Sequence, residues 1–165
     1  MLILIPVVDS VSLLPAVRHV IREFLNGERL EVHLLHVRSP SWLSVTGYLT
    51  GARRDAVHQR AADKALAPAR ALLKRFHIRY TVHVEAGDKA RTIDAVARRI
   101  KADRIVLGTA RHGSATRLAE DSVIQKVLDS APVPVTLVAG RSVSRVERYG
   151  VAAGLSATLW WMLFG

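Results

Sequence analysis

The sequence predicts a single α/β domain at residues 1–140, built on a five-stranded, mostly parallel sheet with helices on both faces, followed by an accessory segment at residues 141–165. Two observations lead to this fold class. Apolar runs of strand length alternate with segments of helical periodicity, which is the pattern of parallel βαβ units with right-handed crossovers. Half of the residues are hydrophobic but only 5% are aromatic, which suits the aliphatic core of a three-layer, Rossmann-like sandwich.

The predicted strands are apolar along most of their length, as expected for strands that are buried on both faces. They are residues 2–8, 30–37, 78–85, 104–107 and 133–138. Between them, apolar residues recur with the helical period. The predicted helices are residues 12–25, 52–76, 92–101 and one near 119–130.

Local signals define some of the helix ends. Ser12 is predicted to cap the first helix, and Asn26-Gly27 to end it. Pro68 lies inside the second helix and is expected to kink or split it. Ser122 is a candidate cap of the last helix.

A ligand site is expected at the carboxyl edge of the sheet, because open parallel sheets bind ligands where their strand order reverses. Four loops reach this edge, at residues 8–12, 37–40, 85–88 and 108–113. The last one begins at Gly108, where an apolar strand opens through a small-residue loop toward a helix. This is where α/β proteins bind phosphates, because backbone N–H groups and the helix dipole favour an anion there.

Composition excludes several other functions. The chain contains no cysteine, which excludes disulfides, thiolate chemistry and cysteine-based zinc sites. No ligand spacing among the seven histidines indicates a metal site, and His33 and His36 are predicted to face opposite sides of one strand. The net charge of +10 is spread over all the helical segments without interleaved aromatic residues, so no nucleic-acid partner is expected.

The C-terminal segment differs in composition from the domain. Residues 141–150 are polar and basic, whereas residues 151–165 carry no charge and include Trp160-Trp161. As a helix, residues 149–164 would span about 24 Å, at or below the short limit for crossing a bilayer. Docking of residues 149–165 on protein is the favoured interpretation, and attachment to a membrane surface is the alternative.

The order of these segments resembles the universal stress protein family over residues 1–139. The resemblance rests on residues 3–6, Asp9-Ser10, and residues 34–37, 85–88, 102–109, 122–127 and, most specifically, 131–138. It implies a fold of the adenine-nucleotide α-hydrolase type and a homodimer, often formed by edge pairing of the last strand. No signal peptide is visible, so a cytoplasmic location is expected, with a peripheral place at the inner membrane as the variant that the tail would allow.

Members of this family that bind ATP carry Gly, two residues, Gly, nine residues, and then Gly followed by Ser or Thr. Gly108 and Ser122 match the first glycine and the hydroxyl position, whereas Arg111 and Asp121 replace the other two glycines. Gly113 lies two residues after the second glycine position.

The family's adenine-holding acidic residue follows the first strand, and here Asp9 stands one residue late while Val8 occupies that place. Val37 matches a rim position at the end of the second strand.

The two replaced glycines leave two interpretations open. In the favoured one, Arg111 pairs with Asp121 and fills the anion site, so that no cofactor binds and the protein is a non-enzymatic stress-response or regulatory protein. In the alternative, Arg111 clamps a phosphate of ATP, with Gly108, Gly113 and Ser122 around it. Asp9 would then lie near adenine. No hydrolase site is indicated, because no nucleophile elbow or suitably placed pair of carboxylates is present.

Overall fold

The computed structural model describes residues 1–7, 10–38, 51–109 and 114–140, without the side chains of residues 10–11, 51–58 and 114–121. Its strands are β1 (Leu2–Val7), β2 (Glu31–Arg38), β3 (Tyr80–Ala86), β4 (Arg104–Thr109) and β5 (Val135–Ala139). Its helices are α1 (Ser10–Leu25), α3 (Gly51–Arg75), α4 (Lys89–Arg99) and α5 (Ser114–Ser130).

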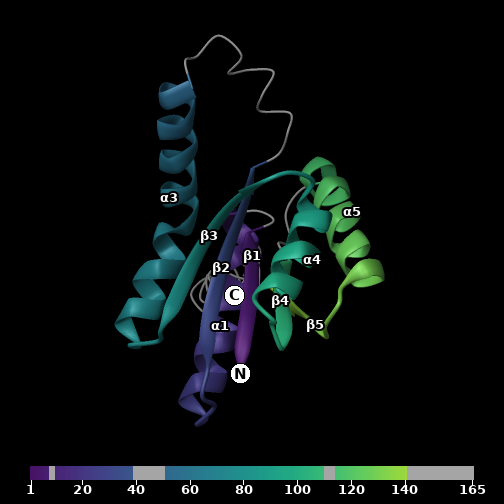
Figure 1. The fold of residues 1–165 in the computed structure, drawn as a ribbon. Helices are drawn as coiled ribbons and strands as arrows, with labels where there is room; N and C mark the ends of the chain where they lie inside the picture. Colours follow the sequence, from purple (N-terminus) through teal and green to yellow (C-terminus); the bar gives the residue numbers. More distant parts are fainter. Residues whose placement is uncertain (8–9, 39–50, 110–113, 141–165) are drawn as a thin grey trace, which may run out of the picture.

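The five strands form one sheet in the order β3-β2-β1-β4-β5, and all neighbours are parallel (Figure 1). The chain therefore adds strands outward from β1 to β3, then returns to the other side of β1 for β4 and β5. Strand order reverses between β1 and β4. These two strands pair only at Ile3 with Arg104 and at Leu4 with Ile105, within the described residues. Their carboxyl halves are thus unpaired with each other, at the switch point where a ligand crevice is expected.

Two hydrophobic cores occupy the two faces of the sheet. One face packs against α1 and α3, and its core includes Ile5 of β1, Val17 of α1 and Leu66 of α3. The other face packs against α4 and α5, with Ile93 of α4 and Val127 of α5 in its core. The predicted three-layer α/β architecture is therefore confirmed.

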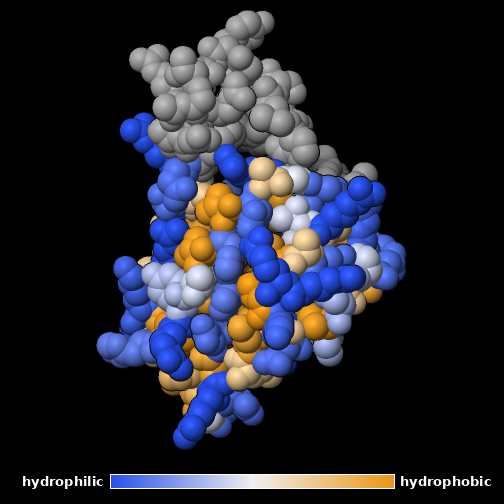
Figure 2. Space-filling view, in the orientation of Figure 1, coloured by the Kyte–Doolittle hydropathy of each residue, from blue (hydrophilic) through white to orange (hydrophobic). Residues whose placement is uncertain are grey.

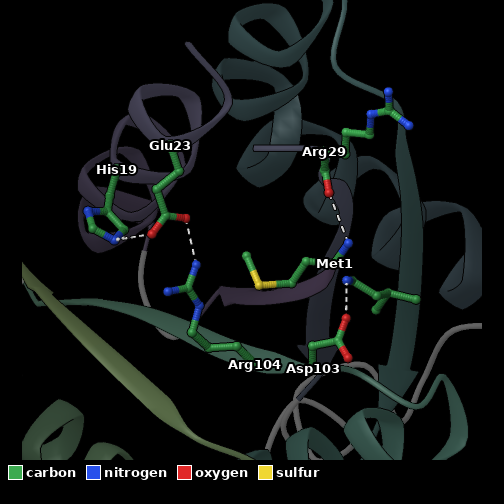
Figure 3. A network of polar contacts seen from close by, with 7 residues as sticks. Met1, His19, Glu23, Arg29, Asp103 and Arg104 are labelled. Atoms are coloured by element: carbon green, nitrogen blue, oxygen red, sulfur yellow. Dashed lines mark hydrogen bonds and ion pairs between the residues drawn. The ribbon is translucent and has the colours of Figure 1, made fainter. Parts of the chain in front are cut away.

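A network of polar contacts joins elements at the amino ends of the strands, opposite the expected ligand edge (Figure 3). Glu23 of α1 forms an ion pair with Arg104 of β4, with 2.6 Å between Oε2 and Nη2, and its other oxygen lies 3.2 Å from His19 Nε2. Asp103 Oδ2 accepts a hydrogen bond of 2.6 Å from the Leu2 amide. These contacts fix the start of β1 and the second half of α1 against β4.

Several predicted boundaries move in the structure. Helix α1 begins at Ser10, so Ser12 lies buried in its first turn and the prediction that it caps the helix is wrong. Helix α4 begins at Lys89, three residues earlier than expected, because Asp88 caps it: its Oδ1 accepts a 3.1 Å hydrogen bond from the Arg91 amide. Helix α3 continues through Pro68 without being split.

Three helices end in the same way, with a residue in the left-handed conformation. Gly27, His77 and Lys101 have φ of 99°, 55° and 53°. After each of them, an amide reaches back to a carbonyl five residues earlier, as in the bonds from Glu28 to Glu23 and from Ala102 to Ala97. This is the Schellman arrangement, which normally uses glycine. The predicted stop at Gly27 is confirmed, whereas the other two ends carry side chains in a strained conformation.

Replacing Lys101, which is exposed, by glycine is expected to raise the free energy of unfolding by about 1 kcal/mol. Glycine adopts positive φ without steric cost, and this gain exceeds its greater entropy in the unfolded chain. Chemical denaturation measures the effect. The matched control is Lys101→Ala, which removes the same charge but keeps Cβ, and it should give no gain. An equal gain in both variants would show that the backbone strain is not the cause.

Candidate functional site

The candidate site lies at the carboxyl ends of β1 and β4, where α1 and α5 begin (Figure 1). A parallel α/β sheet places its ligands here for two reasons: the diverging strands leave room, and helix N-termini direct N–H groups toward it. Of the predicted site residues, the structure describes Gly108, Val37 and Ser122. Asp9, Arg111 and Gly113 lie outside the described residues, as does the side chain of Asp121.

Gly108 has no side chain because the backbone of α1 occupies that space. A Cβ atom at this position would lie 1.7 Å from the carbonyl oxygen of Ser12 and 2.7 Å from its carbonyl carbon. The conformation itself does not demand glycine, since the positive φ values among described glycines belong to Gly27 and Gly87. Gly108 therefore has a structural reason that is independent of the expected phosphate cradle: α1 packs closely on β4 at this residue.

Val37 lies near the carboxyl end of β2, but its side chain points into the core. It is 4% exposed and belongs to the apolar cluster beneath α4 and α5. The position matches the predicted rim, yet the side chain contributes packing at this site.

Ser122 lies inside α5, eight residues after its first residue, and is exposed. The prediction that it caps this helix is therefore wrong. A physical reason is visible in the sequence: residues 114–121 contain neither glycine nor proline, so nothing interrupts the helix before Ser122. At 1.5 Å per residue, Ser122 is about 12 Å along the helix axis from its first residue.

The rim loop between β3 and α4 is held by its own backbone. The Gly87 amide donates a 3.0 Å hydrogen bond to the Arg38 carbonyl, which closes the end of the β2–β3 ladder. Gly87 has a φ of 153°, and a Cβ there would lie 2.8 Å from Thr92 Oγ1. Because Asp88 caps α4, the residues in this part of the rim stabilise the loop and the helix start.

The carboxyl end of β2 is electropositive. Burial, followed by the charges of Lys89 and Arg38, lowers the pKa of His36 below its ordinary value of 6.5. The lowered pKa favours the neutral form of His36 at pH 7, and two cationic side chains, Lys89 and Arg38, act on it at this end of the sheet. Sequence reasoning did not identify this feature, because Lys89 and His36 are distant in sequence and are brought together by the β2–β3–α4 crossover.

Sequence reasoning also missed a pair of histidines, His33 of β2 and His83 of β3, whose ring nitrogens lie 2.8 Å apart. Only the strand register brings them together. His33 and His36 lie on opposite faces of β2, as predicted. Leu35, on the same face as His33, packs into the core beneath α4 and α5, whereas Leu34, on the same face as His36, packs into the core beneath α1 and α3. Within the described residues, no group of three or more histidine or acidic side chains is placed to hold a metal ion.

Replacing Gly108 by alanine is expected to lower the free energy of unfolding by about 1–3 kcal/mol, because the new methyl group meets main-chain atoms of α1 that cannot rotate away. Thermal or chemical denaturation measures this loss. Ser122→Ala, at the other matched position of the phosphate pattern, is the control and should change stability by less than about 0.5 kcal/mol. Wild-type stability in Gly108→Ala would contradict the packing role.

The chain is similar in sequence and in fold to known proteins. The sequence profile of the universal stress protein family matches residues 1–139. No curated protein sequence matches the chain significantly. Among solved structures, the hypothetical protein MJ0577 is 24% identical with a TM-score of 0.67, over 86% of this chain and 96% of that one.

Two further structures contain nucleotides. A universal stress protein family protein from Arabidopsis thaliana with AMP bound is 14% identical, with a TM-score of 0.61 over 87% of this chain and 94% of that one. A universal stress protein in complex with cAMP is 17% identical, with a TM-score of 0.56 over 84% of this chain and 95% of that one. At these identities, the three structures support the fold alone.

Proposed function

The chain belongs to the universal stress protein family, and from this premise we propose that it is a non-enzymatic stress-response or regulatory protein whose inherited nucleotide site is altered. The observation that carries the proposal is the course of α5, which runs unbroken from Ser114 to Ser130 and so includes the last two positions of the phosphate pattern, residues 121 and 122. The glycine expected before the hydroxyl residue is Asp121.

A continuous helix at this place supports loss of the phosphate cradle. Phosphate sites use the first N–H groups of a helix, because these have no partner within the helix. Asp121 and Ser122 lie about two turns beyond the start of α5, where helical N–H groups bond to carbonyls four residues earlier. Their amides are therefore committed to the helix and do not offer a cradle.

The charges of the two replacements support the same conclusion. A carboxylate at residue 121 repels a triphosphate, and a guanidinium at residue 111 is suited to neutralise that carboxylate. We infer that Arg111 pairs with Asp121 and occupies the site with the protein's own groups. Under this proposal the chain has no cofactor.

A modified nucleotide site is the second candidate. It is favoured by the electropositive end of β2 around His36 and by the relatives crystallised with AMP and cAMP. In this arrangement Gly108, Arg111, Gly113 and Ser122 surround phosphates of ATP. Asp9 then holds adenine, and Val37 lies beneath the rim.

A thermal-shift experiment with Mg-ATP distinguishes the two candidates. We expect no change in Tm for the wild type, since a ligand stabilises a protein only if it binds the native state. AMP and cAMP are tested in the same way, with GTP as the control for specificity. A rise of several degrees with any adenine nucleotide, absent with GTP, would contradict the altered-site proposal.

Variants of the two replaced glycines identify the obstacle. Arg111→Gly combined with Asp121→Gly is expected to create a shift with Mg-ATP. Asp121→Ala removes the carboxylate but leaves a helix-forming residue, so it separates charge repulsion from the need for a flexible backbone. Binding by Asp121→Ala alone would show that charge is the whole obstacle.

We propose that the protein is a cytoplasmic homodimer that pairs through the outer edge of β5, beside which the described residues place no further strand. This strand lies at the end of the sheet, and Leu137 on it is 45% exposed. An apolar side chain on an unpaired edge is a liability in a monomer and is covered when two edges pair. Nucleic acid is not proposed as a partner, because the basic residues are spread over all the helical segments without interleaved aromatic residues. On the face seen in Figure 2, apolar and hydrophilic side chains are intermixed.

The accessory segment is proposed to dock on the domain or its partner subunit. None of the helices among the described residues is long and apolar enough to cross a membrane, and residues 149–165 lie outside that description. The membrane-surface alternative requires the tail to bind lipid through its apolar residues.

Truncation after Gly140 is expected to alter the oligomeric state while both forms remain in the supernatant on fractionation. Gly140 is the right end point because its amide donates a 2.9 Å hydrogen bond to the Thr109 carbonyl and so completes the β5 ladder. Light scattering measures the assembly, and centrifugation measures membrane association. Movement of the full-length chain alone into the membrane pellet would instead support lipid attachment.

A further inference from the structure

Two histidine rings on neighbouring strands form a direct side-chain contact. His33 Nδ1 of β2 lies 2.8 Å from His83 Nε2 of β3. The rings are stacked, with centroids 5.0 Å apart and planes inclined by 20°. His33 is buried and His83 is half-buried, on the sheet face that α4 covers. This pair lies away from the β1–β4 crevice and is separate from the proposed nucleotide site.

Proton accounting limits the states in which this contact survives. An imidazole nitrogen either carries a proton and donates, or carries none and accepts. At 2.8 Å, one of the two facing nitrogens must accept. The pair therefore keeps its hydrogen bond when it holds no extra proton or one. With both rings protonated, two N–H groups and two positive charges face each other, and the contact breaks.

The charged groups around the pair come from all three elements that surround it. On β2, Glu31 Oε1 lies 3.5 Å from His33 Nε2. On β3, Glu85 is engaged by Arg99 of α4, with 2.6 Å between Oε1 and Nη2. Burial, followed by the neighbouring His33 and Arg99, lowers the pKa of His83 below its ordinary value of 6.5, and Glu85 acts in the opposite direction.

We propose that the His33–His83 pair is a proton-operated clasp that holds the edge strand β3 to β2 at neutral pH and releases it when both rings are protonated. Among the described residues, β3 has a sheet neighbour on one side only, so a lost side-chain contact is not compensated by a second strand there. Release at β3 is transmitted to the rim, because the Gly87 amide bonded to the Arg38 carbonyl is the end of the same ladder.

The direction of the pH effect follows from linkage. A histidine whose native pKa is lowered stabilises the closed state fully above pH 6.5, the ordinary value. As pH falls below 6.5, the open state takes up a proton that the closed state refuses. The closed state therefore loses stability as the pH falls from 6.5 to the native pKa of His83, and it loses no more below that pKa.

Native-state hydrogen exchange between pH 7.5 and pH 5 tests the clasp. The readout is the protection factor of the β3 amides and of the Gly87 amide, compared with the protection factors of the β1 amides. A protection factor already corrects for the intrinsic pH dependence of exchange. We expect the β3 factors to fall with pH, by about tenfold for each unit by which the native pKa of His83 lies below 6.5. The β1 factors should change less.

His83→Gln removes one of the two titrating rings but keeps a hydrogen-bonding side chain. The pair can then no longer be doubly protonated, so β3 protection should lose the pH dependence that comes from the clasp. His77→Asn is the matched control: it removes an exposed histidine at the end of α3, at a left-handed position that asparagine tolerates. This control should retain the wild-type pH dependence. Equal pH dependence in the wild type and His83→Gln would overturn the proposal.

Nitrogen-15 NMR of the wild-type rings provides a test that does not depend on a variant folding. A coupling between His33 Nδ1 and His83 Nε2 at pH 7.5, lost as the second ring is protonated, supports the clasp. Rings that titrate independently, with no coupling between them at any pH, contradict it.

Discussion

Helix α1 is held along β4 at both of its ends, and the rest of the molecule is arranged around this contact. At the carboxyl end of β4, the Ser12 carbonyl lies where a side chain of residue 108 would be. At the amino end, Arg104 of β4 forms its ion pair with Glu23 of α1. The helix thereby bridges β1, from which it emerges, and β4, which pairs with β1 over only two residues. The backbone of α1 therefore lies directly against β4 at the strand switch, where the ligand site is expected.

This constraint changes what Gly108 signifies. A glycine at the end of a strand, before a helix, is read as a phosphate signal because it lets the backbone approach an anion. Here a second cause is sufficient, since any side chain at residue 108 would displace α1. A glycine at position 108 is therefore expected even in a chain that binds no nucleotide, whereas positions 111 and 121 hold charged residues, Arg111 and Asp121. Packing of α1 thus explains the glycine at position 108, and the proposed loss of the nucleotide explains why positions 111 and 121 are not glycine.

The fold was predictable because it depends on patterns that are local in the sequence. Continuous apolar runs indicate strands buried on both faces, and Asn26-Gly27 indicates a helix end through the conformational freedom of glycine. Helix starts were less predictable: α1 begins before Ser12 and α4 begins at Lys89, because a cap depends on which nearby side chain reaches the first free amides. The candidate site was only partly predictable. Sequence spacing identified Gly108 and Ser122, but not that α5 begins at Ser114, five residues before the predicted start, nor that strand register joins His33 to His83.

Under the proposal, this member of the universal stress protein family retains the frame of a nucleotide site but binds no nucleotide. Native mass spectrometry of the purified full-length chain tests it most directly, because it reports bound small molecules and assembly in one spectrum. We expect a dimer whose mass is that of two polypeptide chains without a bound small molecule. A mass increase that matches an adenine nucleotide, released on denaturation, would contradict it.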